Sequence, residues 1–222
     1  MATKKRVAAT LLAPELPPLV LQWIDQADIR DGATLSNGVF TDLDLSGMIA
    51  SDIAFDRVVL RHGLFSESQI RLGQLLDARF DGCDLANARW EKTHGQRVEM
   101  LGCRLVGFSL VDGQCSNLLL QRCNGESARF WNSSLRDARF EHCSLKTTSF
   151  ENTDLSGVVF HNCDLSGADL RGAKLAGTDL RGCTLEGINV ALADLRGAIL
   201  EPAQLGLLAA LLGVEVRELA ES

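Results

Sequence analysis

The sequence predicts an all-β solenoid, in which the chain coils about one axis with four sides to each coil. Three observations lead to this fold class. Of the 35 positions whose numbers are multiples of five from Leu35 to Leu205, 27 are Leu or Phe. The position two residues earlier is Gly, Ala, Ser, Thr or Cys in 26 of the 35 cases. Six of the seven cysteines lie 20 residues apart, from Cys83 to Cys183.

The five-residue period predicts the four sides, because it matches neither the 3.6-residue period of a helix nor the two-residue period of a strand. If each unit turns the chain by a quarter, the large and small residues share one interior and a coil holds 20 residues. Successive coils would stack by parallel backbone pairing at about 4.8 Å, so about eight coils over 33–205 would form a rod on the order of 40 Å long.

The regularly spaced cysteines occupy the small inward position on one side of every coil. A free cysteine behaves as a small buried hydrophobic residue. Stacked Cβ atoms about 4.8 Å apart would exceed the roughly 3.5 to 4.5 Å that a disulfide requires. Because the sequence also lacks the close Cys pairs of zinc sites, we predict a packing role, with no metal and no cofactor. The residues are Cys83, Cys103, Cys123, Cys143, Cys163 and Cys183.

Composition and charge exclude several classes of function. The formal net charge is −7 and the pI is about 5.1, which argues against direct nucleic-acid binding and against a membrane surface. Pro14, Pro17 and Pro18 interrupt the apolar stretch near the start, so neither a signal peptide nor a spanning helix is expected. We therefore expect a cytoplasmic protein.

Enzymatic motifs are absent from the sequence. It contains no phosphate-binding glycine loop, nucleophile elbow or zinc motif. His62, His94, His142 and His161 fall on outward positions of different columns, where solvated side chains are expected. We predict a protein without catalytic residues.

The units SGADL, RGAKL, AGTDL and RGCTL resemble the pentapeptide repeat family. The resemblance implies a right-handed quadrilateral parallel β-helix over 33–205. Residues 1–32 are then expected to form an irregular N-terminal cap, either a short strand or a helical turn, in which Trp23 and Ile24 cover the first coil.

The C-terminal stretch ILEPAQLGLLAALLGVEV predicts a short α-helical cap and tail over 206–222. Pro202 suits the first turn of a helix and Gly213 suits its end. One apolar face can seal the open end of the coils, as solenoids require. This arrangement is similar to the Qnr and MfpA quinolone-resistance branch of the family, whose C-terminal helix joins two rods. The resemblance implies a homodimer, for which Leu207 and Leu211 are the candidate contacts.

The same branch binds type II topoisomerases, so the resemblance implies DNA gyrase, or topoisomerase IV, as a partner of an acidic, DNA-mimicking rod that modulates quinolone sensitivity. The alternative is that each aspartate only flanks a turn and bonds nearby backbone amides, with Arg171, Arg181 and Arg196 diluting the charge. The candidate carboxylates precede large inward residues in the later coils: Asp154, Asp164, Asp169, Asp179 and Asp194.

The repeat is weakest between residues 91 and 131. Gly95, Cys115 and Gly125 occupy positions for large residues, whereas Phe108 and Leu118 occupy positions for small ones. Over the same stretch four apolar residues stand at outward positions, and Val111 and Trp131 should stack. These four either form an exposed patch for a partner or turn inward at a local bulge. The second candidate function is accordingly a structural or protein-interaction rod with an unknown partner. The four are Leu101, Val106, Val111 and Trp131.

Overall fold

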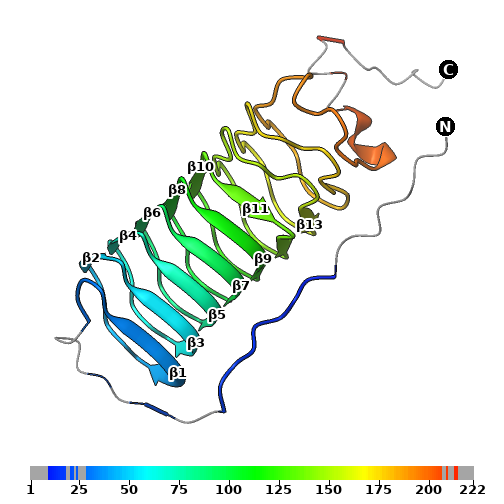
Figure 1. Cartoon of the computed structure of the whole chain (residues 1–222). Helices are drawn as coiled ribbons and strands as arrows, with labels where there is room; N and C mark the ends of the chain where they lie inside the picture. Colours follow the sequence, from blue (N-terminus) through cyan, green and yellow to red (C-terminus); the bar gives the residue numbers. More distant parts are fainter. Residues whose placement is uncertain are drawn as a thin grey trace.

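A computed structural model describes residues 10–18, 21, 22, 24, 29–206, 209, 213 and 214 of the 222-residue chain. The chain coils repeatedly about one axis and forms a rod of stacked parallel strands (Figure 1). Each paired residue lies 20 positions from its partner, as Leu35 with Phe55 and Leu75 with Gly95. The predicted all-β parallel solenoid with a 20-residue coil is therefore confirmed.

The strands belong to two sheets. The larger sheet begins with five eight-residue strands, β1 (Thr34–Thr41), β3 (Ala54–Arg61), β5 (Gln74–Asp81), β7 (His94–Leu101) and β9 (Gln114–Gln121). It continues through the short strands β11 (Ser134–Arg136), β12 (Arg139–Glu141) and β13 (Val159–His161). The second sheet contains β2 (Ile49–Ser51), β4 (Gln69–Arg71), β6 (Arg89–Glu91), β8 (Ser109–Val111) and β10 (Arg129–Trp131).

The strands outline about six turns, fewer than the eight predicted. After β13 the 20-residue pairing continues only as isolated bridges, the last of which joins Asp179 and Ile199. In these coils a turn follows every bridging residue, so no run of paired residues is long enough to form a strand.

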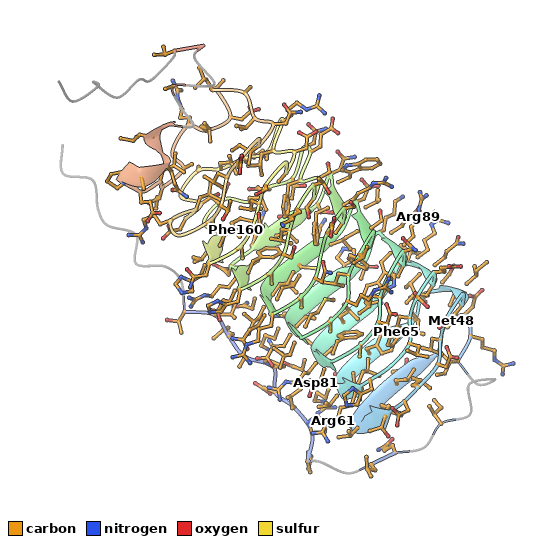
Figure 2. All side chains as sticks on the ribbon, turned by 180° about the vertical axis from the view of Figure 1, so that it is seen from behind. Met48, Arg61, Phe65, Asp81, Arg89 and Phe160 are labelled. Atoms are coloured by element: carbon orange, nitrogen blue, oxygen red, sulfur yellow. The ribbon has the colours of Figure 1, made fainter. Side chains whose placement is uncertain are left out.

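We name the four faces of the rod by their large inward residues. Face 1 carries the 20-residue series from Leu35, face 2 the series from Phe40, face 3 the series from Leu45 and face 4 the series from Ala50. These residues are buried from Leu35 to Val190, whereas Leu195 and Leu200 are half-buried and Leu205 is exposed at the end of the stack. Figure 2 shows Phe65 and Phe160 inside the coil, whereas Arg89 projects from its outside.

A left-handed residue forms each corner between faces. The residue two positions after each large one has a φ between 50° and 83° at every unit from Gly32 to Gly187, and again at Gly197. Twenty-one of these residues are not glycine. The left-handed region costs most side chains about 1–2 kcal/mol, whereas Asn, Asp and Gly adopt it readily. This conformation explains why the residue two positions after each large one is so often Asn, Asp or Gly.

Replacing Leu72 with asparagine is expected to stabilise the rod by about 0.5–1 kcal/mol. Leu72 has a φ of 58° and is 43% exposed, so the change relieves backbone strain without losing a buried contact. Urea unfolding followed by circular dichroism would measure the gain. Leu76→Asn is the matched control, because Leu76 is similarly exposed but lies within β5; equal gains for both variants would contradict the explanation.

The six cysteines stack on the inner side of face 3, as the sequence predicts. All seven cysteines of the chain are buried and free. Each stacked thiol contacts the carbonyl oxygen 23 residues earlier at 3.2–3.5 Å, for example Cys143 with Leu120. Hydroxyl groups on other faces donate to the same relative position, as Thr148 to Gly125. Where the small inward residue is Cys, Ser or Thr, it therefore fills the interior and also donates a hydrogen bond to the preceding coil.

Enlarging one of these residues should destabilise the stack. Cys143→Leu adds volume to a closed interior and is expected to cost about 1–3 kcal/mol. Cys143→Ser retains the size and the donor and should cost less than about 1 kcal/mol. Urea midpoints at constant m-value would measure both costs, and a Leu variant as stable as the Ser variant would show that the column has spare room.

The exchange of large and small residues in the middle coils is confirmed. Gly95 and Cys115 leave space in the interior of face 1, and Val98, Phe108 and Leu118 fill it from small positions, each no more than 3% exposed. The core therefore stays continuous through the part of the sequence where the repeat is weakest.

Both ends of the stack are covered by irregular segments. At the N-terminal end, Leu21 bridges to Val39 and Ile24 packs against the core, but Trp23 lies outside the described residues. At the other end the 3-10 helix η2 (Pro202–Gln204) covers the last coil, and Gln204 Nε2 donates to the carbonyl oxygens of Leu180 and Cys183 at 2.8 and 2.9 Å.

The predicted α-helical cap over 206–222 is not supported. Within the part of the chain that the structure describes, the helical element at this end is the one-turn η2, and most of 206–222 lies outside that part. No helix among the described residues combines the length and the apolar character needed to cross a bilayer.

Candidate functional site

The five candidate aspartates do not form one acidic surface. Asp154 and Asp194 lie on face 1, Asp179 on face 2, Asp164 on face 3 and Asp169 on face 4. Since each five-residue unit turns the chain by a quarter, only units separated by a multiple of 20 residues share a face. The candidate aspartates are therefore distributed over all four faces of the rod.

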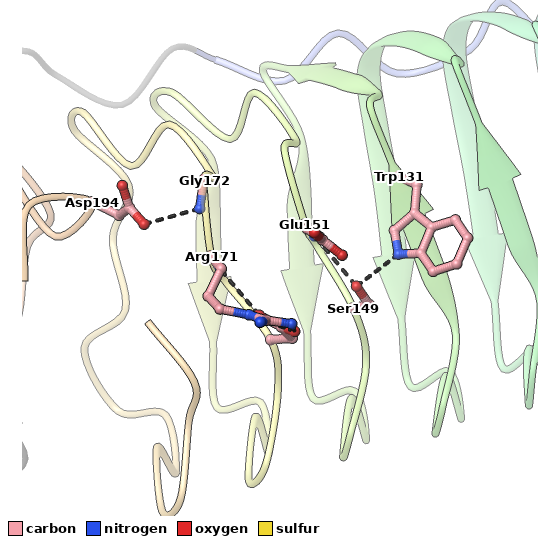
Figure 3. Close-up of polar contacts among 7 residues, drawn as sticks. Trp131, Ser149, Glu151, Arg171, Gly172 and Asp194 are labelled. Carbon is pink, nitrogen blue, oxygen red and sulfur yellow. Dashed lines mark hydrogen bonds and ion pairs between the residues drawn. The ribbon is translucent and has the colours of Figure 1, made fainter. Parts of the chain in front are cut away.

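These aspartates instead stabilise turns. Oδ1 of Asp169 accepts the backbone N–H of Arg171 at 3.1 Å, and Oδ2 receives the guanidinium at 2.6 Å (Figure 3). Arg181 binds Asp179 in the same way, and the hydrogen bonds from the arginine side chain lower the pKa of each carboxyl. Asp194 accepts the backbone N–H of Gly172 at 2.9 Å. The contacts agree with the turn-flanking alternative.

Face 3 carries most of the net negative charge. Its outward positions and the corner that follows it contain six carboxylates and two basic side chains. On each of the other three faces, the acidic and basic counts differ by at most one. Four of the seven excess negative charges of the chain therefore lie along one side of the rod. The carboxylates are Asp44, Glu67, Asp84, Glu126, Asp164 and Glu186; the basic residues are Arg104 and Lys146.

The two basic residues of face 3 neutralise only part of this charge. Arg104 pairs with Asp84 at 3.0 Å and Lys146 with Asp164 at 3.2 Å. Glu67, Glu126 and Glu186 are exposed and lie three coils from one another. At about 4.8 Å a coil, they place carboxylates about 14 Å apart along the rod. The sequence carries this signal in carboxylates that recur at multiples of 20 positions, such as Asp44, Asp84 and Asp164.

The four apolar candidates are not one patch. Val111 and Trp131 are paired neighbours on face 4, as predicted, but Leu101 lies on face 2 and Val106 on face 3. Trp131 is 39% exposed; its Nε1 donates to Ser149 Oγ at 2.8 Å and Arg129 lies 5.4 Å over its ring (Figure 3). Only the Val111–Trp131 pair remains as an apolar contact surface.

A hollow of about 860 Å³ on face 1 was not predicted. It lies over β7 and β9, at the coils where Gly95 and Cys115 replace large residues. Its lining includes the apolar Leu75 and Leu76 as well as the polar Gln96 and Gln114. In the sequence, the signal for this hollow is that Gly95 and Cys115 both occupy large positions of face 1. Taken alone, they appear only as two breaks in the repeat.

The remaining candidates give no chemical site. The described residues contain no group of three or more metal-ligating side chains. All four histidines are exposed, and burial raises the pKa of the Cys115 thiol to about 12, which keeps it protonated. The dimer candidates Leu207 and Leu211 lie outside the described residues.

The geometry defines the class of protein as a parallel solenoid built from five-residue units. Family models for the pentapeptide repeat region and for pentapeptide repeats match residues 133–207 and 74–110, which together make up half of the chain. The chain belongs to the pentapeptide repeat family.

Solved structures resemble the chain over most of its length. A trypsin-treated point variant of QnrB1, a plasmid-mediated fluoroquinolone resistance protein, is 25% identical with a TM-score of 0.49, covering 91% of this chain and 98% of its own. Full-length QnrB1 is 24% identical with a TM-score of 0.47, covering 88% and 97%. HetL from the cyanobacterium Nostoc, involved in heterocyst differentiation regulation, is 20% identical with a TM-score of 0.27, covering 77% and 87%. No curated protein matches the chain.

Proposed function

We propose that this protein is a non-enzymatic, cytoplasmic interaction rod whose acidic face 3 binds a positively charged groove on a protein partner. The observation that carries the proposal is the concentration of the negative excess on that face. A rod with carboxylates along one side can occupy a groove that otherwise neutralises the phosphates of duplex DNA. Over the coils that the structure describes, no face carries more basic than acidic side chains, so we do not expect the rod to bind nucleic acid directly.

DNA gyrase is the first partner to test, with topoisomerase IV as the second. The sequence resemblance to the quinolone-resistance branch selects these enzymes, and the charge of face 3 suits their DNA-binding surface. All five later aspartates accept a hydrogen bond from a backbone amide, so the contribution of face 3 comes instead from its exposed glutamates, Glu67, Glu126 and Glu186.

A supercoiling assay with charge-reversed variants tests this proposal. The protein should inhibit gyrase at micromolar concentration, and the triple change of Glu67, Glu126 and Glu186 to Lys should weaken inhibition about tenfold or more. The matched control changes Asp52, Asp112 and Glu151 of face 4 to Lys, which alters the net charge equally. Equal loss in both triples would show non-specific charge dependence. No inhibition, and no relief from a quinolone, would favour a rod with another partner.

We further propose a homodimer through the C-terminal end. Leu192, Ile199 and Leu205 are each 42–56% exposed near the last coil, and covering them in a second copy would remove apolar area from water. Light scattering at micromolar concentration should give twice the 24.1 kDa mass of the chain. A monomeric mass would contradict the dimer.

A further inference from the structure

Residues 10–18, which we call the strap, run along the outside of the rod. They contain no helix or strand, and the first segment of the coloured trace passes alongside the edges of the long strands (Figure 1). The backbone N–H of Leu12 donates to Asn117 Oδ1 at 2.9 Å, and that of Glu15 donates to Asp77 Oδ1 at 2.8 Å. Both acceptors are left-handed corner residues between faces 1 and 2, two coils apart.

Side chains that point out of the coil are covered along this side of the rod. Asp77, which accepts the Glu15 N–H, is 3% exposed. Val39 and Val59, at outward positions of face 2, are each 1% exposed, and Val39 bridges to Leu21, a few residues after the strap. Outward residues at matching positions on face 4, such as Ile49, are as much as 75% exposed. We call the corner residues Asp77 and Asn117, together with Val39 and Val59 on face 2, the corner strip. It offers apolar contacts beside fixed hydrogen-bond acceptors.

The two donors of the strap have the same spacing as the two acceptors of the strip, and this spacing is one turn of a polyproline II helix. That helix has three residues per turn and rises about 3.1 Å per residue, so one turn advances about 9.3 Å. Two coils advance about 9.6 Å. The donors Leu12 and Glu15 are three residues apart, and the half-buried Leu11, Pro14 and Pro17 follow the same interval. Leu16 is half-buried as well.

We propose that the corner strip is a docking site for extended, proline-containing segments, and that the strap is its resident occupant. A partner segment fits if it adopts the polyproline II conformation, with free backbone N–H groups three residues apart and apolar residues at the same interval. Side chains of Asn117 and Asp77, not a strand ladder, hold the strap at Leu12 and Glu15. Such a segment opens locally, although its tethering gives it a high effective concentration against a competitor.

Binding of a labelled peptide tests the exchange. The probe is a fluorescent peptide of residues 10–18, TLLAPELPP, measured by anisotropy against the full chain. A full-length variant with Leu11→Ser and Pro14→Ser weakens only the resident strap and should bind the peptide about tenfold more tightly than the unmodified protein. Adding Asn117→Ala should weaken binding. Asn132→Ala, at a corner away from the strip, is the matched control and should not.

Two outcomes would overturn the proposal. One is a weakened-strap variant that keeps the circular dichroism of the parent and yet binds the peptide no better. The other, which needs no variant, is hydrogen exchange in the unmodified protein: the amides of Leu12 and Glu15 should exchange much faster than core amides such as that of Phe140. Equal protection would show that the strap is a permanent part of the rod.

Discussion

Replacing Phe140 with alanine is expected to lower the free energy of unfolding by about 3–5 kcal/mol. Phe140 is fully buried, and its ring stacks on that of Phe160 with 4.7 Å between centroids. It also meets the rings of Phe130 and Phe150 edge-on at about 6 Å. The cavity would lie in the middle of the stack, where coils on both sides are held in register and cannot close it.

Urea unfolding followed by circular dichroism would measure this loss. Phe140→Leu is the control, because it retains most of the volume and should cost less than about 1.5 kcal/mol. If the alanine variant lost no more than the leucine variant, the interior would have to relax around the cavity, contrary to the close packing of the aromatic series.

Arg97→Ala is expected to destabilise the protein by about 3 kcal/mol at neutral pH. Arg97 binds both carboxylate oxygens of Asp77, at 2.5 and 2.6 Å, and Asp77 is only 3% exposed. Removing the guanidinium leaves a buried carboxylate without its charged partner. The control is Arg104→Ala, whose pair with Asp84 is largely exposed and should contribute less than about 1 kcal/mol.

The cost of Arg97→Ala should also depend on pH. The hydrogen bond from Arg97 holds the pKa of Asp77 below its ordinary value. This stabilisation is complete above the unfolded-state pKa of about 3.9 and is lost as the pH falls through the lower folded-state pKa. In the variant, protonation relieves the buried charge instead. The difference in stability should therefore narrow below about pH 4, and a difference independent of pH would contradict the assignment.

The sequence was sufficient to predict the interior of this protein. A period of five in large residues and of 20 in cysteines determines which side chains point inward and which are stacked, because inward packing depends on residue size alone. It also located the exchange around Gly95 and Phe108. The number of coils was overestimated, since pairing in the last coils depends on how tightly each turn closes and not on residue size.

The outer surface was harder to predict. Asp169 and Asp179 differ by two units and therefore lie on opposite faces, so aspartates at the same place in the repeat do not share a surface. The excess of carboxylates on face 3 is apparent only when the outward residues are grouped by face. The strap could not be found from periodicity, because its partners Asp77 and Asn117 lie 62 and 105 residues from it along the chain.

The position of the strap orders events during synthesis. Leu12 leaves the ribosome before its acceptor Asn117, which follows 105 residues later. At about 5–20 residues per second, the segment must wait roughly 5–20 seconds before its binding surface exists. Each coil can stack on the coil before it as the chain grows, but the strap can bind only after the coils that contain Asp77 and Asn117 have been made.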